Sequence, residues 1–426
     1  MNRFVVLPKV VTNFAFGFLL IAYFLIFFND FLGFEGALGV VLLYTLFLKI
    51  KYFRSKSAGL TSQEWWLIGT IVFYIFMMAL STIVNYTDFI HVEKFVAKYN
   101  KVLYFLAFVY LLVFINFNFQ KFEIFIKIMA YATILMLLIE VAIYGLGTHL
   151  GGEFSNRGTG AWYFSSVMIA TVVLAVDKLK KGIKSEFNHY ILLSAVLAMI
   201  IVFTSTRSIW LSMLFSLLLI GLFGFKSYQL HRLLNLKHYL LALVCVFVIS
   251  TLTFDKWSQR VNDAVNDVEF MQKGEFYTSL GLRVVMYKTA LDGIEQNPIL
   301  GIGEVNYKKT LQDIYLSKMN TDEEALFERI SKFKQIHNQF LMDAWMKGVL
   351  GFISLILLFA VPFIIFYKAL AHKDSVAIGL IGIGFLMNSF VFFQFGAVLT
   401  YSHGLVFFVL WLVLLTSVVA SHKREI

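Results

Sequence analysis

Residues 332–366 read KFKQIHNQFLMDAWMKGVLGFISLILLFAVPFIIF, and the chain changes character within this stretch. Before Phe340 it is rich in Lys, Gln, His and Asn, whereas 340–366 is long and apolar enough to cross a bilayer, which takes roughly 20 residues. The preceding segment, 255–337, is the one long polar interruption in the chain, and His337 is its only histidine. We therefore expect any chemistry to lie at this membrane edge.

The composition outside that interruption is that of a membrane protein. Of the 426 residues, 59% are hydrophobic and 15% are charged, whereas a soluble domain carries about 25% charged residues. The short alternating segments of a membrane β-barrel are absent. The sequence therefore predicts an all-α, polytopic bundle of about twelve membrane helices. The expected spans are 13–30, 32–48, 65–84, 102–116, 124–145, 160–176, 190–206, 208–225, 239–254, 340–366, 375–395 and 404–420.

The distribution of charge predicts the topology. The chain has a net charge of +10, but the segment 255–337 holds eleven Lys and Arg against thirteen Asp and Glu, a balance of −2. The positive excess lies in short connectors that follow even-numbered spans, among them 49–56, 178–184 and 226–237. By the positive-inside rule both termini are cytoplasmic and 255–337 faces outward. This pattern argues for contact with membrane lipids and against a nucleic-acid partner.

The predicted organisation has three parts. Residues 1–254 hold spans one to nine, 255–339 form a helical outer domain, and 340–426 hold the last three spans. The single cysteine, Cys245, lies in an apolar run and permits no disulfide within one chain. The outer face shows no His-x-x-x-His element, Asp pair or Cys cluster, and zinc needs three or four such ligands. We therefore expect no metal and no cofactor.

Arginines on the outer face are the first candidate site residues. Five of the nine arginines fall on that face in the predicted topology, against the positive-inside bias. They are Arg157, Arg207, Arg260, Arg283 and Arg329. A planar guanidinium binds phosphate with two hydrogen bonds in a way that lysine does not match. Some of these arginines are therefore expected to bind a phosphate group.

Arg207 gives the sharpest of these signals. It stands in FTSTRSIW (203–210), between two apolar stretches with almost no polar spacer. A charge this close to hydrocarbon is costly and marks a functional site by default. The alternative is an arginine that reaches lipid headgroups with its long side chain. The flanking Thr and Ser residues favour a polar pocket over a lipid-facing flank.

Arg283 lies at the start of an expected amphipathic helix, because Leu282, Val285, Met286 and Thr289 recur at helical spacing. The helix must end at NPILGIG (297–303), where Pro and two glycines force a turn. This turn lacks the Lys and Ser/Thr of a phosphate-binding P-loop. Taken alone, Arg283 reads as an ordinary solvated helix residue.

His337 is the candidate general base, because imidazole titrates near neutral pH and can take a proton from a hydroxyl. Three further histidines, His91, His149 and His403, also fall on the outer face and compete for this role. Asp343, six residues after His337, either orients the base or caps polar contacts inside the bundle.

These elements together resemble the O-antigen ligase family, within the wider group that includes O-antigen polymerases. The resemblance rests on STRSIW (205–210), on Arg283 upstream of NPILGIG, on HNQFL (337–341) and on GVLG (348–351). By motif it covers roughly 190–355, and by topology the whole chain. Each motif is short, but their order and spacing are fairly specific. One departure is Ser208, where the family often has a glycine after the arginine; the arginine itself is kept.

The resemblance implies a GT-C-like, inverting and metal-independent glycosyltransferase of the bacterial inner membrane, with its site at the periplasmic face. Such enzymes move a glycan from undecaprenyl diphosphate onto a sugar hydroxyl of lipid A–core. His337, Arg207 and Arg283 match the family's histidine and arginine positions and are the expected catalytic residues. The two arginines would also bind the donor. Arg157 and Asn338 are added as expected substrate contacts, Arg157 on topology alone.

Other functions stay open from the sequence. A repeat-unit polymerase shares topology and donor but uses a second lipid-linked glycan as acceptor. A protein-directed oligosaccharyltransferase of the same superfamily is disfavoured, because those enzymes usually have a longer C-terminal extension. A transporter is of a different class, and we see neither the broken helices nor the paired halves that such folds often show.

Overall fold

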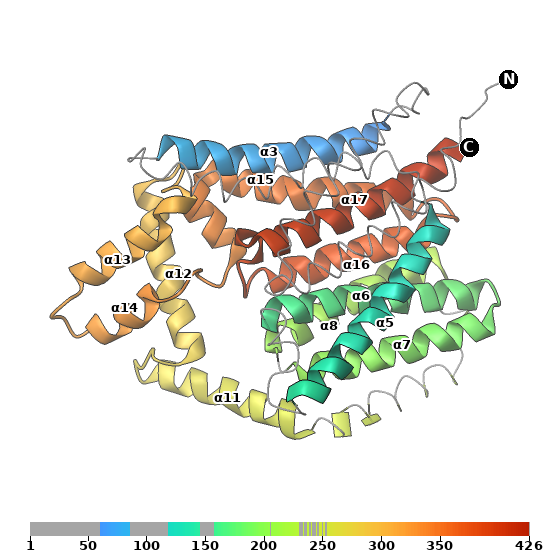
Figure 1. Ribbon diagram of the computed structural model, residues 1–426, viewed down its shortest axis with the longest axis horizontal. Coiled ribbons are helices and arrows are strands. Elements are labelled where there is room, and N and C mark those ends of the chain that lie inside the picture. Colours follow the sequence, from blue (N-terminus) through green and yellow to red (C-terminus); the bar gives the residue numbers. More distant parts are fainter. Residues whose placement is uncertain are drawn as a thin grey trace.

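The computed structural model describes residues 60–85, 118–144, 157–204, 206–229 and 254–425, with isolated positions between them from 233 to 251. Within these ranges all regular elements are helices (Figure 1). They are α3 (Ser62–Val84), α5 (Phe119–Tyr144), α6 (Arg157–Lys180), α7 (Lys184–Phe203), α8 (Arg207–Ser227), α11 (Phe254–Gln272), α12 (Ser279–Gln296), η2 (Glu304–Asn306), α13 (Tyr307–Ser317), α14 (Glu324–Ser331), α15 (Gln339–Ala369), α16 (Val376–Phe392), η3 (Val398–Thr400) and α17 (Ser402–Glu425).

The predicted membrane spans coincide with helices wherever the structure describes them. The helices α3, α5, α6, α7, α8, α15 and α17 are long and apolar enough to cross a bilayer, and α16 is a shorter apolar helix. In α17, residues 404–421 are all buried inside the protein. The expected spans 13–30, 32–48 and 102–116 lie outside the described residues, as does all of 239–254 except isolated positions. The coarse prediction of a polytopic helical membrane protein is confirmed.

One end of the bundle is held by ion pairs. Lys178, in the last turn of α6, lies 2.8 Å from a carboxylate oxygen of Glu123 on α5 and 2.7 Å from one of Glu186 on α7. The ammonium of Lys181 lies 5.2 Å from the ring centroid of Phe119, the first residue of α5. The end of α6 therefore meets the beginnings of α5 and α7. Spans that alternate in direction require the end of one helix to lie beside the beginnings of such neighbours. Here this occurs at the end of the bundle that is predicted to be cytoplasmic.

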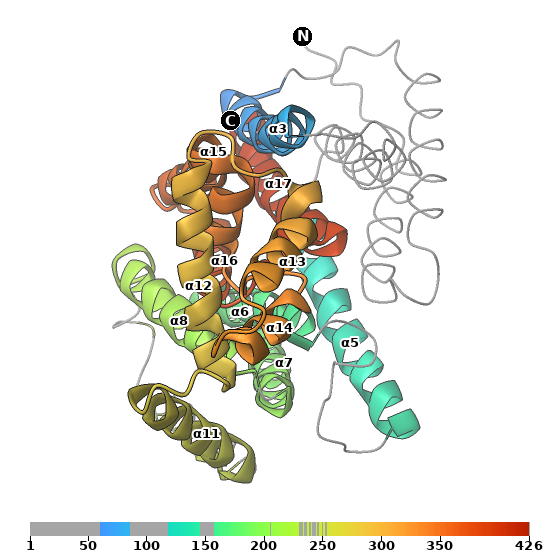
Figure 2. The same ribbon diagram turned by 90° about the vertical axis from the view of Figure 1, so that its left-hand side faces the viewer.

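The polar segment forms a helical cap beyond the opposite end of the bundle (Figure 1). Figure 2 looks onto this end, where α12, α13 and α14 lie in front of the bundle with α11 at its edge. The cap has its own apolar core, which includes Met286, Tyr307, Phe327 and Trp345. Because Trp345 belongs to α15, the cap is packed directly onto a membrane helix. The outer segment is thus helical, as the sequence predicts.

The glycine-rich turn after α12 docks into a break in α15. Gly348 has φ +66°, so the helix is interrupted there. The amide of Val349 donates to the carbonyl of Pro298 at 2.8 Å, and the amide of Gly303 donates to Met346 at 2.8 Å. Non-helical backbone at this depth is tolerated because its polar groups are satisfied by protein. The expectation of unbroken helices is wrong for 340–366, since sequence does not show which glycine adopts positive φ.

A buried ionic network joins the cap to the bundle. The carboxylate of Asp343 accepts hydrogen bonds from Tyr74 of α3, from Gln339 and from Lys347, each at 2.8 Å. The Lys347 ammonium also lies 3.5 Å from Glu304 of the cap. Of the two roles open to Asp343, the structure supports polar contacts inside the bundle. Removing one member of such a network strands a buried charge, which is strongly destabilising.

We expect Gly348→Ala to lower the free energy of unfolding by about 1–3 kcal/mol, because positive φ is strained for alanine. The added Cβ would also clash with the carbonyl oxygen of Ile299. Thermal unfolding in detergent measures the loss. Gly69→Ala in α3 is the control, since its Cβ meets nothing within 4 Å. Equal melting temperatures for the two variants would contradict this account of the break.

Candidate active site

His337 occupies an unusual backbone position just before α15. Its φ is +56°, in the left-handed region that non-glycine residues rarely adopt. The next residue, Asn338, is the N-cap of α15, and its side-chain oxygen accepts from the amide of Leu341 at 3.0 Å. A strained residue of this kind persists only where its surroundings hold it, and such residues gather at functional sites.

The surroundings that hold His337 are the segment linking α16 to α17. Residues 335–339 and 393–399 run side by side and exchange hydrogen bonds. They include Gln335 Oε1 with the Ala397 amide, the His337 ring with the Phe395 backbone, the Gln339 amide with the Phe393 carbonyl at 2.7 Å, and Gln339 Oε1 with the Leu399 amide at 2.7 Å. The turn that carries the imidazole is therefore fixed from the side of the bundle.

Tyr287 fixes the same turn from the side of the cap. Its hydroxyl lies 3.1 Å from the carbonyl oxygen of His337 and 3.0 Å from that of Gln394. Tyr287 is one turn after Arg283 on α12, so the two side chains leave the helix on the same face. The helix thus presents the arginine and the clamp for the histidine together.

The environment keeps the imidazole of His337 neutral. Burial is the main cause, and the positive charge of Arg283 is the second; together they lower the pKa of His337 from 6.5 to about 4. The hydrogen bond to the Phe395 backbone acts in the opposite direction. Because that bond raises the pKa, the ring donates it, and the second ring nitrogen keeps its lone pair at neutral pH. Such a nitrogen can accept a proton.

Arg283 is not the solvated helix residue that its sequence context alone suggests. Burial lowers its pKa, and the charges of Tyr287, Arg207 and Asp267 also act on it. An arginine stays protonated under these conditions. Arg283 is therefore a half-buried cation close enough to both Arg207 and His337 for electrostatic interaction.

Arg207 is the first residue of α8, at the end of the bundle that faces the cap. Its guanidinium Nη2 lies 3.5 Å from Oδ2 of Asp267 on α11. The three residues predicted as catalytic thus come from α8, from α12 and from the turn before α15, and Arg283 interacts electrostatically with both of the others. The site combines two cations with a neutral imidazole.

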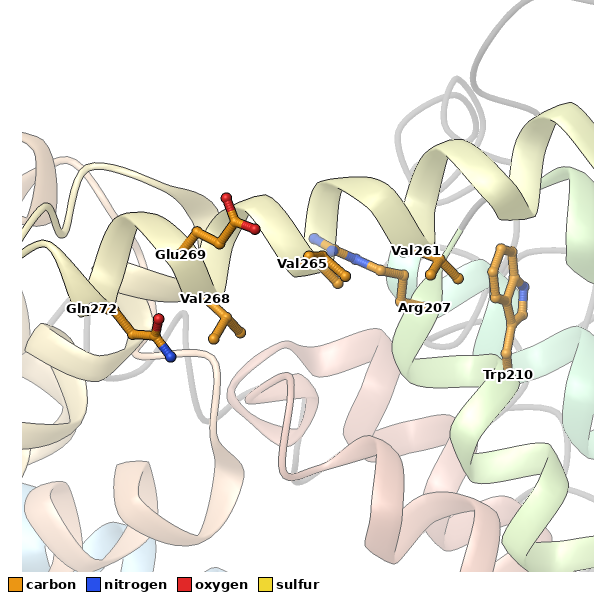
Figure 3. A pocket seen from close by; sticks show the side chains of 8 residues that line it. Arg207, Trp210, Val261, Val265, Val268, Glu269 and Gln272 are labelled. Carbon is orange, nitrogen blue, oxygen red and sulfur yellow. The ribbon is translucent and has the colours of Figure 1, made fainter.

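A groove lined mainly by apolar side chains opens beside Arg207. It lies between α8 and α11 and has a volume of about 500 Å³. Figure 3 shows Arg207 and Trp210 reaching from α8 toward the side of α11 that carries Val261 and Val265. The positively charged Arg207 therefore lies beside an apolar groove, at the first residue of a membrane helix.

The other predicted site residues are placed less directly. Arg157 begins α6, but its side chain lies outside the described residues. Asn338 uses its amide oxygen as the helix cap, and its amide nitrogen lies 3.4 Å from the side-chain oxygen of Gln394. Its role as a substrate contact stays a prediction. His403 stacks on Tyr401 with ring centroids 5.5 Å apart, while His91 and His149 lie outside the described residues.

The structure adds residues to the site that no sequence motif indicates. Asp267 and Tyr287 contact Arg207 and the His337 turn, and Gln339 and Gln394 secure that turn. The spacing of Tyr287 four residues after Arg283 was visible in the sequence. Nothing in the sequence marks Asp267 among the other acidic residues of the outer segment.

The chain is similar to a known protein family and to individual known proteins. The family model described as O-antigen ligase matches residues 192–356, which contain Arg207, Arg283 and His337. A protein of Haemophilus influenzae described as uncharacterized is 26% identical over 361 residues, covering 83% of this chain and 86% of its own length. A protein of Escherichia coli K12 described as O-antigen ligase is 23% identical over 247 residues, covering 57% of this chain and 53% of that protein. Residues 192–356 of this chain match the O-antigen ligase family model, which agrees with the resemblance seen in the sequence.

Proposed function

We propose that this protein transfers a glycan from undecaprenyl diphosphate to a sugar hydroxyl of lipid A–core at the outer face of the bacterial inner membrane. The observation that carries the proposal is the convergence of Arg207, Arg283 and the neutral imidazole of His337 beside an apolar groove. Two cations suit a diphosphate leaving group, and the imidazole suits an attacking hydroxyl. The family of residues 192–356 supports the same chemistry.

On the donor side, the bond between the anomeric carbon and the diphosphate oxygen breaks, and its electron pair stays with the diphosphate. Arg207 and Arg283 would bind the phosphate oxygens and stabilise the charge that develops on them. Burial strengthens this interaction, because a desolvated cation is screened less than one in water. The arginines therefore supply in this site what a bound divalent cation supplies in many glycosyl transfers.

On the acceptor side, the hydroxyl oxygen attacks the anomeric carbon from the face opposite the diphosphate. Attack from that face inverts the configuration. The hydroxyl proton passes to the second ring nitrogen of His337, and the positive charge formed there balances the negative charge gained by the diphosphate. The ring donates its other hydrogen bond to the Phe395 backbone, which orients it. Tyr287 holds the backbone of the same turn.

The groove gives the donor's lipid tail a route from the membrane. Its wall on α8 continues into a lipid-facing surface, where Leu211, Leu214, Leu218 and Leu222 are exposed along the helix. An isoprenoid chain can therefore pass from lipid into the groove without leaving apolar surroundings. Its diphosphate would then lie at Arg207.

We extend the proposal to the architecture. The fold would be GT-C-like with about twelve membrane helices, both termini cytoplasmic, and the three-part organisation 1–254, 255–339 and 340–426. The exposed Trp65 and Trp66 at the start of α3 suit the cytoplasmic interface, where aromatic residues are enriched. Cysteine accessibility at the two ends of α3 tests this orientation directly.

The test of function is transfer by purified protein in detergent, with an undecaprenyl-diphosphate glycan, lipid A–core and EDTA. We expect lipopolysaccharide of higher mass on a gel. Chain growth on a second lipid-linked glycan, with none on lipid A–core, would instead assign the protein as a polymerase. Movement of the lipid donor across the bilayer without transfer would assign a transporter.

The pH dependence of transfer should differ from that of an ordinary histidine enzyme. His337 must be neutral to accept the proton, and its pKa is lowered to about 4. Activity should therefore stay level from pH 7.5 down to about pH 5.5 and fall only nearer pH 4. The rate at limiting donor concentration measures this. A half-maximal rate at pH 6.5 would contradict the environment described for His337.

A further inference from the structure

The guanidinium of Arg207, which would bind a donor phosphate under the proposed function, is paired with Asp267. Asp267 is more buried than its partner: its side chain is 13% exposed and that of Arg207 is 35% exposed. The carboxylate also acts electrostatically on Arg283. One anionic side chain therefore stands beside both cations of the site.

The placement of Asp267 on α11 links this anion to the apolar groove. The same helix carries Val261, Val265 and Val268, which line the groove together with Arg207 and Trp210 (Figure 3). Val268 follows Asp267 directly in the chain. A shift of α11 that separates Asp267 from Arg207 would therefore also move the wall of the groove that these valines form.

We propose that Asp267 is a placeholder anion, which the donor's diphosphate displaces from Arg207 on binding and which returns to Arg207 as undecaprenyl diphosphate leaves. This inference rests on the proposed function and adds an anion-exchange step to it. Two carboxylate or phosphate groups cannot share the guanidinium without like-charge repulsion, so binding of the diphosphate requires that the pair open. The returning carboxylate would compete with the leaving group and speed its release.

The alternative is that the pair serves only to hold α11 in place. A partly exposed ion pair contributes about 0–1 kcal/mol to stability, so its removal should barely change unfolding. Its effect on anion binding should be larger, because the carboxylate competes directly for the phosphate site. If Asp267 competes for the phosphate site, removing its charge should therefore tighten anion binding. If the pair only holds α11 in place, the same substitution should not.

The experiment measures binding of undecaprenyl diphosphate to purified full-length protein, together with single-turnover and multiple-turnover transfer. Asp267→Asn and Asp267→Ser both remove the charge. The first replaces the carboxylate with an amide of similar shape, and the second replaces it with a smaller hydroxyl. We expect about tenfold tighter binding of undecaprenyl diphosphate in both variants, an undiminished single-turnover rate and a lower multiple-turnover rate. Asp267→Glu keeps the carboxylate and should bind undecaprenyl diphosphate and transfer glycan over multiple turnovers as the wild type does.

The matched control is Asp255→Asn, which makes the same charge change on α11 about three turns earlier. It should leave binding and both rates as in the wild type. Unchanged or weaker binding in both charge-removing variants, with wild-type transfer intact, would overturn the placeholder role alone. A wild-type protein that neither binds undecaprenyl diphosphate nor transfers glycan would instead overturn the proposed function.

Discussion

His337→Asn should lower glycan transfer by at least about 100-fold, since a positioned general base contributes roughly 10²–10⁴-fold. Asparagine is the informative replacement because it tolerates the left-handed backbone better than most residues. His337 has φ +56°, so alanine would add backbone strain to the loss of the imidazole. The initial rate with saturating donor and acceptor measures the effect.

The control for this variant is its folding. Apart from the bond between the His337 ring and the Phe395 backbone, the hydrogen bonds between 335–339 and 393–399 come from Gln335 and Gln339 and do not need the imidazole. We therefore expect the melting temperature of His337→Asn to stay within a few degrees of the wild-type value. A folded His337→Asn protein with near-normal transfer would remove this histidine from the mechanism.

Arg283→Gln should lower transfer by about 10²–10³-fold, the usual effect of removing one electrostatic stabiliser of a transition state. It should also change the pH dependence. The charge of Arg283 is one cause of the low pKa of His337, so its removal raises that pKa toward 6.5. The residual activity of Arg283→Gln should therefore fall at a higher pH than wild-type activity does.

Arg329→Gln is the matched control for Arg283→Gln. It removes the same charge from the same outer segment, where Arg329 donates to the carbonyl oxygen of Tyr277 at 3.2 Å on the exposed cap. Its rate and pH profile should match the wild type. Equal losses for the two variants would mean that the net charge of the cap, and not the diphosphate site, governs transfer.

The membrane helices were the part of the fold most accessible from sequence. Long apolar runs such as 340–366 predict membrane helices, because in lipid the backbone N–H and C=O groups of such a run must form hydrogen bonds with each other. The break in α15 was missed, since it depends on how Gly348 meets the turn at Pro298. Neither partner shows this contact in its own local sequence.

A site residue can be predicted from sequence where its side chain is energetically unfavourable at its position. Arg207 is such a residue, because a charge beside the membrane hydrocarbon costs free energy and therefore indicates a functional site. Asp267 and Tyr287 are not, because their importance comes from tertiary contacts with Arg207 and with the His337 turn. The low pKa of His337 was equally hidden, since it arises from burial and from Arg283, which is distant in sequence.

The proposed glycan transfer is tested most directly by release of undecaprenyl diphosphate from purified wild-type protein in EDTA, measured together with the glycosylated product. We expect release that requires the acceptor, equals the product mole for mole, and is lost in both His337→Asn and Arg283→Gln. Product without undecaprenyl diphosphate, or undiminished release in the two variants, would contradict the role of these residues as the site of glycan transfer.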